Sequence, residues 1–398
     1  MAGGSESRGR TDSEQAGHLD LAQTRELFDA STDFTIGLEE EFALVDPDSL
    51  ELVHRFEELY AAACDDDLLV DSAAGELIAS EIEIRSGRAE SFAEAVDLQR
   101  ERRARLFALA DSLGIGLAAT GTHPWANYLD QRIIDTPHYS LLREQLHWVA
   151  QRNNTWSLHL HMGIRGADRA IAVCDYLRGV LPQLLALSAN SPFLDGRDTG
   201  LQSVRTEIFT RTFPRCGIHE PFRTFAEYAD FIDLLVRTGS VTEATQLWWS
   251  VRPHHTFGTV EVRICDAQTT GEESFGLAAL IAACVAQTAS DYDDSLLPEP
   301  LRQREVEENL WRAIRYGMDG RMIDFGSRSE VPTAAAIERL IEWSTPAREQ
   351  LGLDVALPPL NGAQRARKEL AEGASIPDIY RGAVAATRRT YAGEHVPG

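Results

Sequence analysis

The segment Thr35–Val45 constrains the fold more than any other, because its residues alternate between apolar and acidic side chains. Side chains two residues apart share one face of a strand, so Glu39 and Glu41 lie together, opposite an apolar face. Glu40 is the only polar residue on that apolar face. The face otherwise consists of Ile36, Leu38, Phe42 and Leu44.

Two neighbouring carboxylates repel each other unless a positive charge lies between them. For a single Glu-x-Glu pair the simplest explanation is a solvated strand face, since charged side chains usually lie outside. A bound cation is the alternative, and hard oxygen ligands select Mg²⁺ or Mn²⁺. The rest of the sequence decides between the two.

Three further segments repeat this pattern of an apolar face backed by ionisable side chains. The expected strands are Glu76–Gly87, Trp156–Ile164 and Thr259–Cys265. Their polar faces carry Glu81, Glu83, Arg85, His159, His161, Glu261, Arg263 and Cys265. Each face alone is compatible with a half-exposed surface or a weak ion pair. Four such faces in one sheet form a concave surface dense in carboxylate, which indicates bound divalent cations.

Most of the remaining chain is expected to be helical. Helices are expected at about 91–113, 139–152, 168–190, 224–238, 272–290, 301–317, 333–350 and 361–391, with a short buried strand at Gly116–Ala119. Strands interleaved with helices, without regular βαβ spacing, favour an α+β fold. Residues 1–30 are expected to form a mobile leader, and residues 31–395 a single domain, because no break divides them.

Composition excludes several classes of partner. The net charge of −24 disfavours nucleic acid and anionic membranes. The longest apolar run, Leu277–Ala286, is too short to span a bilayer, and the N-terminus has no apolar signal segment. The five cysteines include no Cys-x-x-Cys pair, which suits free thiols in a reducing cytoplasm. The sequence leaves open whether the protein forms a homo-oligomer.

Lys368 is the only lysine among 38 basic residues. The chain therefore has no Gly-Lys-Ser/Thr phosphate loop and no kinase-type lysine strand. Any phosphate that the protein handles must be bound by arginine, backbone amides or a metal ion.

The donor set also indicates the type of metal. Four or more carboxylates with one or two imidazoles suit Mg²⁺ or Mn²⁺ bound beside phosphate oxygens. A zinc hydrolase would use three close ligands with a larger share of nitrogen or sulfur. Such a metal-dependent hydrolase remains an alternative from a different class, because His159 and His161 form a His-x-His pair.

Eight segments, in order over about residues 34–320, resemble the family-2 glutamate–cysteine ligases, also called carboxylate–amine ligases, of the glutamine-synthetase-like superfamily. They are Ile36-Gly-Leu-Glu-Glu-Glu-Phe-Ala-Leu-Val-Asp46, Ile82-Glu-Ile-Arg-Ser-Gly87, Gly121-Thr-His-Pro124, Ser157-Leu-His-Leu-His-Met-Gly163, Ala189-Asn-Ser-Pro-Phe-Leu-Asp-Gly-Arg-Asp-Thr-Gly-Leu-Gln-Ser-Val-Arg205, Trp248-Trp-Ser-Val-Arg-Pro-His254, Gly258-Thr-Val-Glu-Val-Arg-Ile-Cys-Asp-Ala-Gln268 and Trp311-Arg-Ala-Ile-Arg-Tyr-Gly317. The family often has Thr-Gly where this chain has Ser86-Gly87.

The resemblance implies a largely antiparallel, funnel-like sheet backed by helices, of the glutamine synthetase/glutamate–cysteine ligase catalytic-domain type. It implies a ligase that uses ATP and Mg²⁺ to activate a glutamate γ-carboxylate as an acyl phosphate, which an amine then attacks. Cysteine is the expected amine, with another amino acid or amine as the alternative. A non-catalytic nucleotide or metal sensor with this fold is a third class.

The resemblance also implies roles for individual residues. The implied metal ligands are Glu39, Glu41, Glu83, His159 and Glu261. Glu81 could replace Glu83 or act beside it, and His161 is a further ligand or a contact to ATP. Arg205, Arg252 and His161 are the implied ATP contacts, and Glu41, Arg205 and Arg263 the implied catalytic residues.

Other conspicuous residues have plainer explanations. Trp248, Trp249 and Trp311 are expected to pack rather than to enclose substrate. For His123 the sequence allows two roles, either shaping its loop or contacting substrate. Cys265 is expected on the polar face of its strand, but no base lies near it in the sequence to make it a nucleophile.

Overall fold

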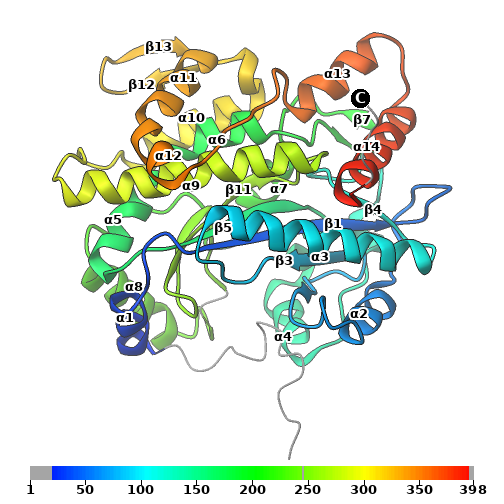
Figure 1. Ribbon diagram of the computed structural model, residues 1–398, viewed down its shortest axis with the longest axis horizontal. Coiled ribbons are helices and arrows are strands. Elements are labelled where there is room, and N and C mark those ends of the chain that lie inside the picture. Colours follow the sequence, from blue (N-terminus) through cyan, green and yellow to red (C-terminus); the bar gives the residue numbers. More distant parts are fainter. Residues whose placement is uncertain (1–19, 244–245, 394–398) are drawn as a thin grey trace, which may run out of the picture.

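The computed structural model describes residues 20–243 and 246–393 (Figure 1). Its core is a seven-stranded sheet in the order β10-β11-β5-β1-β3-β2, with β4 paired to β1, and every pairing is antiparallel. The strands are β1 (Ile36–Val45), β2 (Ala73–Ala74), β3 (Glu81–Arg85), β4 (Gly116–Ala118), β5 (Ser157–Gly163), β10 (Val251–His254) and β11 (Thr259–Asp266). The α+β fold with an antiparallel sheet is therefore confirmed.

The register of these strands brings the expected polar faces together. Glu41 lies opposite Glu83, and Glu39 lies opposite both Arg85 and His159. In the next row, His161 lies opposite Glu261. Residues directly opposite in an antiparallel pair point to the same side of the sheet, so one face collects the charges.

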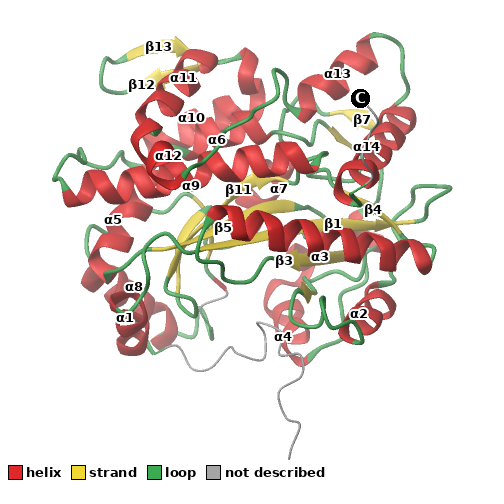
Figure 2. Ribbon diagram, viewed as in Figure 1, coloured by secondary structure: helices red, strands yellow, loops and turns green. Residues whose placement is uncertain are grey.

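Helices surround the sheet, and the strands occupy the middle of the molecule (Figure 2). In the view of Figure 1, α9, α6 and α10 lie above the sheet and α2 and α4 below it. The helices are α1 (Leu21–Asp29), α2 (Phe56–Cys64), α3 (Phe92–Ser112), α4 (Pro137–Leu146), α5 (Ala167–Leu177), α6 (Leu181–Ser188), α7 (Val204–Thr212), α8 (Phe225–Arg237), α9 (Gly271–Asp293), α10 (Gln303–Tyr316), α11 (Thr333–Trp343), α12 (Thr345–Leu351), α13 (Gly362–Ala371) and α14 (Ile376–Tyr391).

Three small two-stranded pairings lie outside the main sheet. They are β6 (Phe193–Leu194) with β7 (Arg197–Asp198), β8 (Cys216–Gly217) with β9 (Trp248–Trp249), and β12 (Arg321–Asp324) with β13 (Ser329–Pro332).

Helix α9 is the centre of the largest hydrophobic core. Its Thr270 N-cap forms a capping box with Glu273, which satisfies the free amides of the first turn. Its composition and length would allow it to cross a membrane, but 89% of the tested window is buried inside the protein. A bent pair formed by α5 and α6, with an angle of 59°, passes the same test. Burial on all sides explains why α9 is apolar all round.

The expected helices form, but several are divided. The segments 168–190, 333–350 and 361–391 each contain two helices, and 139–152 contains α4 followed by the 3₁₀ helix His147–Arg152. Proline stands in the first turn of α6, α12 and α14. Proline lacks an amide hydrogen and fits only the start of a helix, so each one begins a new element. Helices α2 and α7 were not expected.

The expected leader includes a segment that belongs to the fold. Within residues 1–30, Leu21–Asp29 forms α1, capped by Asp20. Phe28 is fully buried in the main core, so this segment packs like any other helix. The expected boundary at residue 30 is therefore wrong for the described part, whereas residues 1–19 lie outside the described residues.

Cys265 was expected on the polar face of its strand, and this is wrong. The pairing of β11 with β5 shifts register between Val262 and Cys265. The extra residue turns Cys265 to the apolar side, where it is fully buried in the main core. Burial raises the pKa of its thiol to about 12, so Cys265 is a core residue and not a nucleophile.

Glu40, the polar residue on the apolar face of β1, is compensated by its neighbours. Arg103 of α3 donates to both of its carboxylate oxygens, at 3.0 and 3.2 Å. Gln99 donates at 2.8 Å, and the Ser274 hydroxyl of α9 also contacts it. The Arg103 guanidinium lies 4.0 Å from the ring centre of Phe275. This buried ion pair links the sheet to two helices.

Replacing Arg103 with methionine should destabilise the protein by about 3 kcal/mol, because it leaves the Glu40 carboxylate buried without its cation. Urea unfolding followed by circular dichroism measures the change. Arg237→Met is the matched control, since Arg237 makes an exposed pair with Asp233 on α8. An equal shift in both variants would show that the Glu40 pair has no special structural role.

Candidate active site

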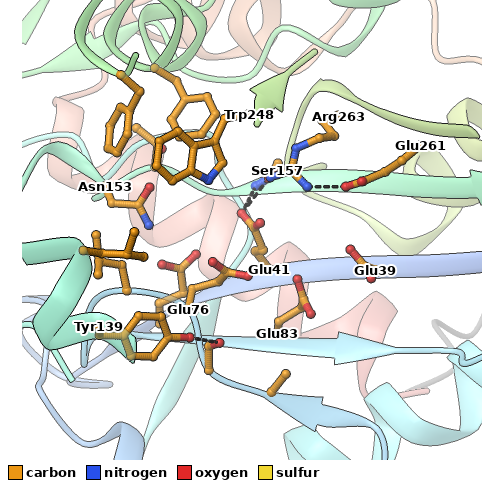
Figure 3. Close-up of a pocket in the computed structure, with 18 of the residues that line it drawn as sticks. Glu39, Glu41, Glu76, Glu83, Tyr139, Asn153, Ser157, Trp248, Glu261 and Arg263 are labelled. Carbon is orange, nitrogen blue, oxygen red and sulfur yellow. Dashed lines mark hydrogen bonds and ion pairs between the residues drawn. The ribbon is translucent and has the colours of Figure 1, made fainter. Parts of the chain in front are cut away.

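A cavity of about 130 Å³ lies on the charged face of the sheet (Figure 3). Side chains of β1, β3, β5, β10 and β11 line it, together with α4 and Trp248. Figure 3 shows Glu41, Glu76 and Glu83 near one another in this space, with Glu41 directed at Ser157 and Glu39 to one side. The lining therefore includes most of the polar residues that the alternating strands predict, and His159 lies beside it, next to Glu39.

Three groups of donor atoms in this cavity are close enough to share a metal ion. In each group the candidate ligand atoms lie within 4.8 Å of one another. The groups are Glu39–His161–Glu261, Glu39–Glu83–His159 and Glu41–Glu76–Glu83. Every metal ligand expected from the sequence belongs to at least one group, and Glu39 and Glu83 each belong to two.

Glu76 completes the third group and was not expected there. It lies before β3, which begins only at Glu81, although the sequence suggested a strand from Glu76 onward. Ile78 makes only an isolated bridge with Ile133. Because Glu76 precedes the regular strand, alternation does not determine the direction of its side chain. Glu76 lies seven residues before Glu83, an odd separation that would place the two side chains on opposite faces of a regular strand.

Neighbouring side chains fix the orientation of several donors. The Ser157 amide and hydroxyl both donate to Glu41 at 2.6 Å. His159 lies between Glu39 and Ser157, with its Nδ1 3.2 Å from a Glu39 oxygen and its Nε2 2.8 Å from the Ser157 hydroxyl. The Nδ1 atom of His161 is 3.0 Å from the Thr259 hydroxyl. Such second contacts orient ligands before a cation binds.

The carboxylates of β3 are crowded by like charges. Burial, followed by repulsion from Glu41, raises the pKa of Glu76 to about 8. Burial is also the main reason why the pKa of Glu81 and that of Glu83 lie well above the usual range; neighbouring acids add to it, and Arg85 offsets it only in part at Glu83. Divalent cations would relieve this repulsion and favour the charged forms. The donor set and its electrostatics thus fit Mg²⁺ or Mn²⁺.

The opposite end of the row is compensated by protein cations. Burial would raise the pKa of Glu261, but Arg252 and Arg263 hold it well below the usual range. Arg252 donates to both carboxylate oxygens, at 2.6 and 3.3 Å, and Arg263 also contacts the carboxylate. Glu261 therefore has both a candidate cation group and two arginine partners, and its Oε1 lies 3.7 Å from His161 Nε2.

Glu39 and His161 form a second compensated pair, with 3.3 Å between Oε1 and Nε2. Burial opposes the charge of each group, but their mutual attraction prevails: the pKa of Glu39 is lowered and that of His161 is raised. These directions indicate an ionised pair when no cation is bound.

Arg205 lines the cavity from the start of α7. Its guanidinium donates to the backbone carbonyls of Ile264 and Arg263 at 3.0 and 3.2 Å, and lies 3.6 Å from Asp266. Its Nε atom is buried and has no partner. Arg205 thus holds the end of β11 while keeping one donor unused beside the cavity.

A larger cavity of about 720 Å³ meets the first at Glu39, Arg85 and His161. Its lining includes Phe257, whose ring stacks on His254 with 4.4 Å between the ring centres. Phe257 is 45% exposed, so its other face is available to a ligand. The charged row therefore continues into space for a much larger molecule.

Some of the conspicuous aromatic and histidine residues are buried in the protein, whereas others line the cavity or are exposed. His123 and Trp249 are buried structural residues, and His255 contacts the Tyr228 hydroxyl. Trp248 and His254 line the cavity, whereas Trp311 is 39% exposed on α10. The packing expectation holds for Trp249 and for Trp248, which packs against Phe213 while lining the cavity, and not for Trp311.

His123 shapes the loop after β4. Its Nδ1 accepts from the amides of Trp125 and Ala126, at 3.3 and 3.0 Å. Its Nε2 must then carry the proton and donates to the Leu50 carbonyl at 2.8 Å. All of its hydrogen-bonding capacity is used within the protein, which excludes a direct contact to substrate.

Two solved enzymes have the same fold. The bifunctional glutathione synthetase from Pasteurella multocida matches with a TM-score of 0.67 at 13% identity, over 93% of this chain and 54% of that longer one. The glutamate–cysteine ligase from Francisella tularensis, solved in complex with AMP, matches with a TM-score of 0.62 at 11% identity, over 93% and 91%. These two likenesses show the fold of the chain, an antiparallel sheet backed by helices.

Sequence comparison identifies the family. The family model of glutamate–cysteine ligase family 2 matches residues 35–381. A protein from Sorangium cellulosum is 39% identical over 342 residues, which cover 86% of this chain and 89% of that protein. One from Rubrobacter xylanophilus is 35% identical over 357 residues, covering 89% and 91%. Both carry the name glutamate–cysteine ligase 2 provisionally. The chain belongs to glutamate–cysteine ligase family 2, a family of carboxylate–amine ligases.

Adding Mg²⁺ or Mn²⁺ should raise the melting temperature by several degrees, because a ligand that binds only the folded state stabilises it. Differential scanning fluorimetry with increasing metal measures this effect. Glu83→Gln should remove most of the rise, since Glu83 belongs to two donor groups. Glu58→Gln, on the surface of α2, is the control. An undiminished rise in Glu83→Gln would place the cation elsewhere.

Stability should fall with acid in a way that depends on His123. Burial lowers its pKa to about 4 from an ordinary value of 6.5. The neutral ring therefore contributes fully above pH 6.5, and up to about 3 kcal/mol is lost as the pH falls toward 4. His123→Asn removes this titration, so its free energy of unfolding should approach that of the parent between pH 7 and 4.5.

The matched control is His147→Asn at an exposed position. Urea unfolding at several pH values gives the difference between each variant and the parent. A difference for His123→Asn that stays constant with pH would contradict the assignment of a neutral, structural histidine.

Proposed function

We propose that the protein is an ATP- and Mg²⁺-dependent ligase that joins the γ-carboxylate of L-glutamate to the amine of L-cysteine. In this reaction a glutamate oxygen attacks the γ-phosphorus of ATP, which gives γ-glutamyl phosphate and ADP. The cysteine amine then attacks the acyl carbon, loses a proton, and phosphate leaves. The single observation that carries the proposal is the row of three donor groups that share carboxylates beside buried arginines.

The chain offers Glu39, Glu41, Glu83, His159 and Glu261 as cation ligands, with Glu76 as the addition from the structure. His161 is the further ligand in the group with Glu39 and Glu261. Bound Mg²⁺ would neutralise charge on the phosphates and on the carboxylate being activated. Glu41 is oriented for this role by two donors from Ser157.

Arginine supplies the protein's own positive charge, since the chain has no lysine in the cavity. Arg263 and Arg252 meet at Glu261, and Arg205 reaches the cavity from α7. We assign these side chains to phosphate and to the developing acyl phosphate, where a planar fork binds two oxygens at once. Their links to Glu261 and to backbone carbonyls hold them in place before substrate arrives.

The two adjoining cavities support a division of the substrates. The space of about 720 Å³ beside Glu39 and Phe257 can take a nucleotide, with its phosphates toward the donor groups. The smaller cavity has an apolar end, which suits an amino acid with a small uncharged side chain. The apolar lining there consists of Leu77, Leu142, Leu146, Phe209, Phe213 and Trp248. A different amine acceptor in the same chemistry remains the alternative.

A zinc hydrolase receives no support from the donor groups. Each group found in the described residues contains at most one imidazole and no thiolate, whereas zinc prefers a larger share of nitrogen and sulfur. Tightly bound, stoichiometric zinc in the purified protein would reverse this conclusion.

We further propose that residues after the N-terminal segment form one catalytic domain that works in the cytoplasm on small molecules. All five cysteines are free, which suits a reducing compartment. The net charge of −24 speaks against nucleic acid and anionic membranes as partners. A homo-oligomer is compatible with the proposal, and gel filtration with light scattering tests it.

The direct test is release of ADP in the presence of ATP and Mg²⁺, with glutamate alone and then with each amino acid. The proposal expects release that needs glutamate and is strongest with cysteine. Dependence on another amine would keep the ligase chemistry and change the acceptor. No release with any pair, from folded protein, would overturn the proposal.

Substitutions in the charged row should reduce this activity strongly. Glu41→Gln and Glu261→Gln should abolish ADP release while the fold is retained, because each removes a cation ligand from the cavity. Arg263→Lys should reduce kcat by about 100-fold, since a bidentate fork becomes a point charge. Arg312→Lys, on the surface of α10, is the matched control. Activity within about twofold of the parent in Arg263→Lys would make Arg263 a structural partner of Glu261.

A further inference from the structure

Glu81 is the one acid of the charged row that the proposed function leaves without a role. Its side chain is fully buried, and neither carboxylate oxygen has a hydrogen-bond partner in the described structure. It nevertheless lines the cavity. A buried carboxylate without partners is costly, and most such groups in proteins are satisfied. This cost indicates a cationic partner that arrives with a ligand.

A divalent cation is not the best partner for Glu81. Metal ions of this kind need several converging oxygen or nitrogen ligands. Glu81 belongs to none of the three donor groups found among residues 20–243 and 246–393. A primary ammonium group is different, because one carboxylate oxygen or two can bind it through its N–H donors.

The position of Glu81 along the sheet matches the length of an amino acid. Glu81 and Glu83 point to the same side of β3, two residues apart, which corresponds to ~7 Å along a strand. Glu81 lies opposite Ala43 of β1, whose small side chain leaves room at this level. The γ-carboxyl carbon and the α-nitrogen of extended glutamate are about 5 Å apart. A glutamate with its γ-carboxylate near Glu41 and Glu83 therefore brings its α-nitrogen toward Glu81.

We propose that Glu81 binds the α-ammonium group of the glutamate whose γ-carboxylate is activated. This inference rests on the proposed ligase function and adds a residue that recognises the donor substrate. The donor keeps its α-ammonium charged throughout the reaction, whereas the acceptor's amine must become neutral before it attacks. A carboxylate that is ionised when the ammonium group binds beside it therefore suits the donor and not the acceptor. The interaction selects glutamate over dicarboxylic acids that lack the amine.

The test compares glutamate with glutarate, which has the same carbon chain and no amino group. Isothermal titration calorimetry with Mg²⁺ and a non-hydrolysable ATP analogue gives both dissociation constants for the parent and for Glu81→Gln. We expect the parent to bind glutamate at least tenfold more tightly than glutarate, as for a buried charged hydrogen bond. Glu81→Gln should lose this preference through weaker glutamate binding, with glutarate binding within about twofold of the parent.

Glu83→Gln is the control on the same face of β3, because it belongs to two donor groups. It should weaken glutamate and glutarate equally, since both present the carboxylate to be activated. The weaker binding of glutamate should also appear in the kinetics of ADP release. There Glu81→Gln should raise KM for glutamate and change kcat less. Melting temperatures establish that both variants are folded.

The outcomes separate the two proposals. Unchanged glutamate affinity in Glu81→Gln, or equal weakening of both ligands, would overturn the role of Glu81. Absence of binding of either ligand by the parent would overturn it as well. Loss of the preference for glutamate in Glu81→Gln, together with no ADP release by the parent, would retain the role of Glu81 in binding and overturn the ligase function instead.

Discussion

The structure depends on how one face of an antiparallel sheet accommodates a row of buried carboxylates. At one end of the row the protein supplies the compensation itself, through Arg252 and Arg263 at Glu261. In the middle, Glu39 is paired with His161. At the other end, burial and repulsion from neighbouring acids raise the pKa of Glu76, Glu81 and Glu83, although Arg85 pairs with Glu83. The electrostatic deficit therefore lies on β3 and the loop before it, and ligands must correct it there.

Strand β1 also carries a buried acid on its other face, Glu40, which the protein compensates completely. Arg103, Gln99 and Ser274 surround Glu40, so its charge and its hydrogen-bonding capacity are satisfied within the protein. A pair that is complete in this way fixes the sheet against α3 and α9, whereas the incomplete row on the other face remains open to substrates. The complete set of partners identifies Glu40 as a structural acid, whereas Glu81 on the opposite face of the sheet has no hydrogen-bond partner among the described residues.

Alternation within strands made most of the site predictable from the sequence. Glu39, Glu41, Glu83, His161 and Glu261 all reach the cavity, and His159 lies beside it, because a period of two assigns each to one face. The residues that escaped prediction lie where this period ends. Glu76 precedes β3. Cys265 follows a register shift in β11 that the local sequence does not predict. Helix boundaries failed in the same manner, at prolines that begin α6, α12 and α14.

The register shift in β11 also explains how a distant loop reaches the site. It turns Cys265 into the core and brings Asp266 opposite Ser157. There Asp266 accepts hydrogen bonds from the Ser191 and Ser203 hydroxyls, at 2.7 and 2.8 Å, at the two ends of the loop that leads to α7. Arg205 follows directly and donates to the carbonyls of Arg263 and Ile264, within the shifted segment. A regular strand would use those carbonyls in pairing, so the irregularity supplies the acceptors that hold Arg205 beside the cavity.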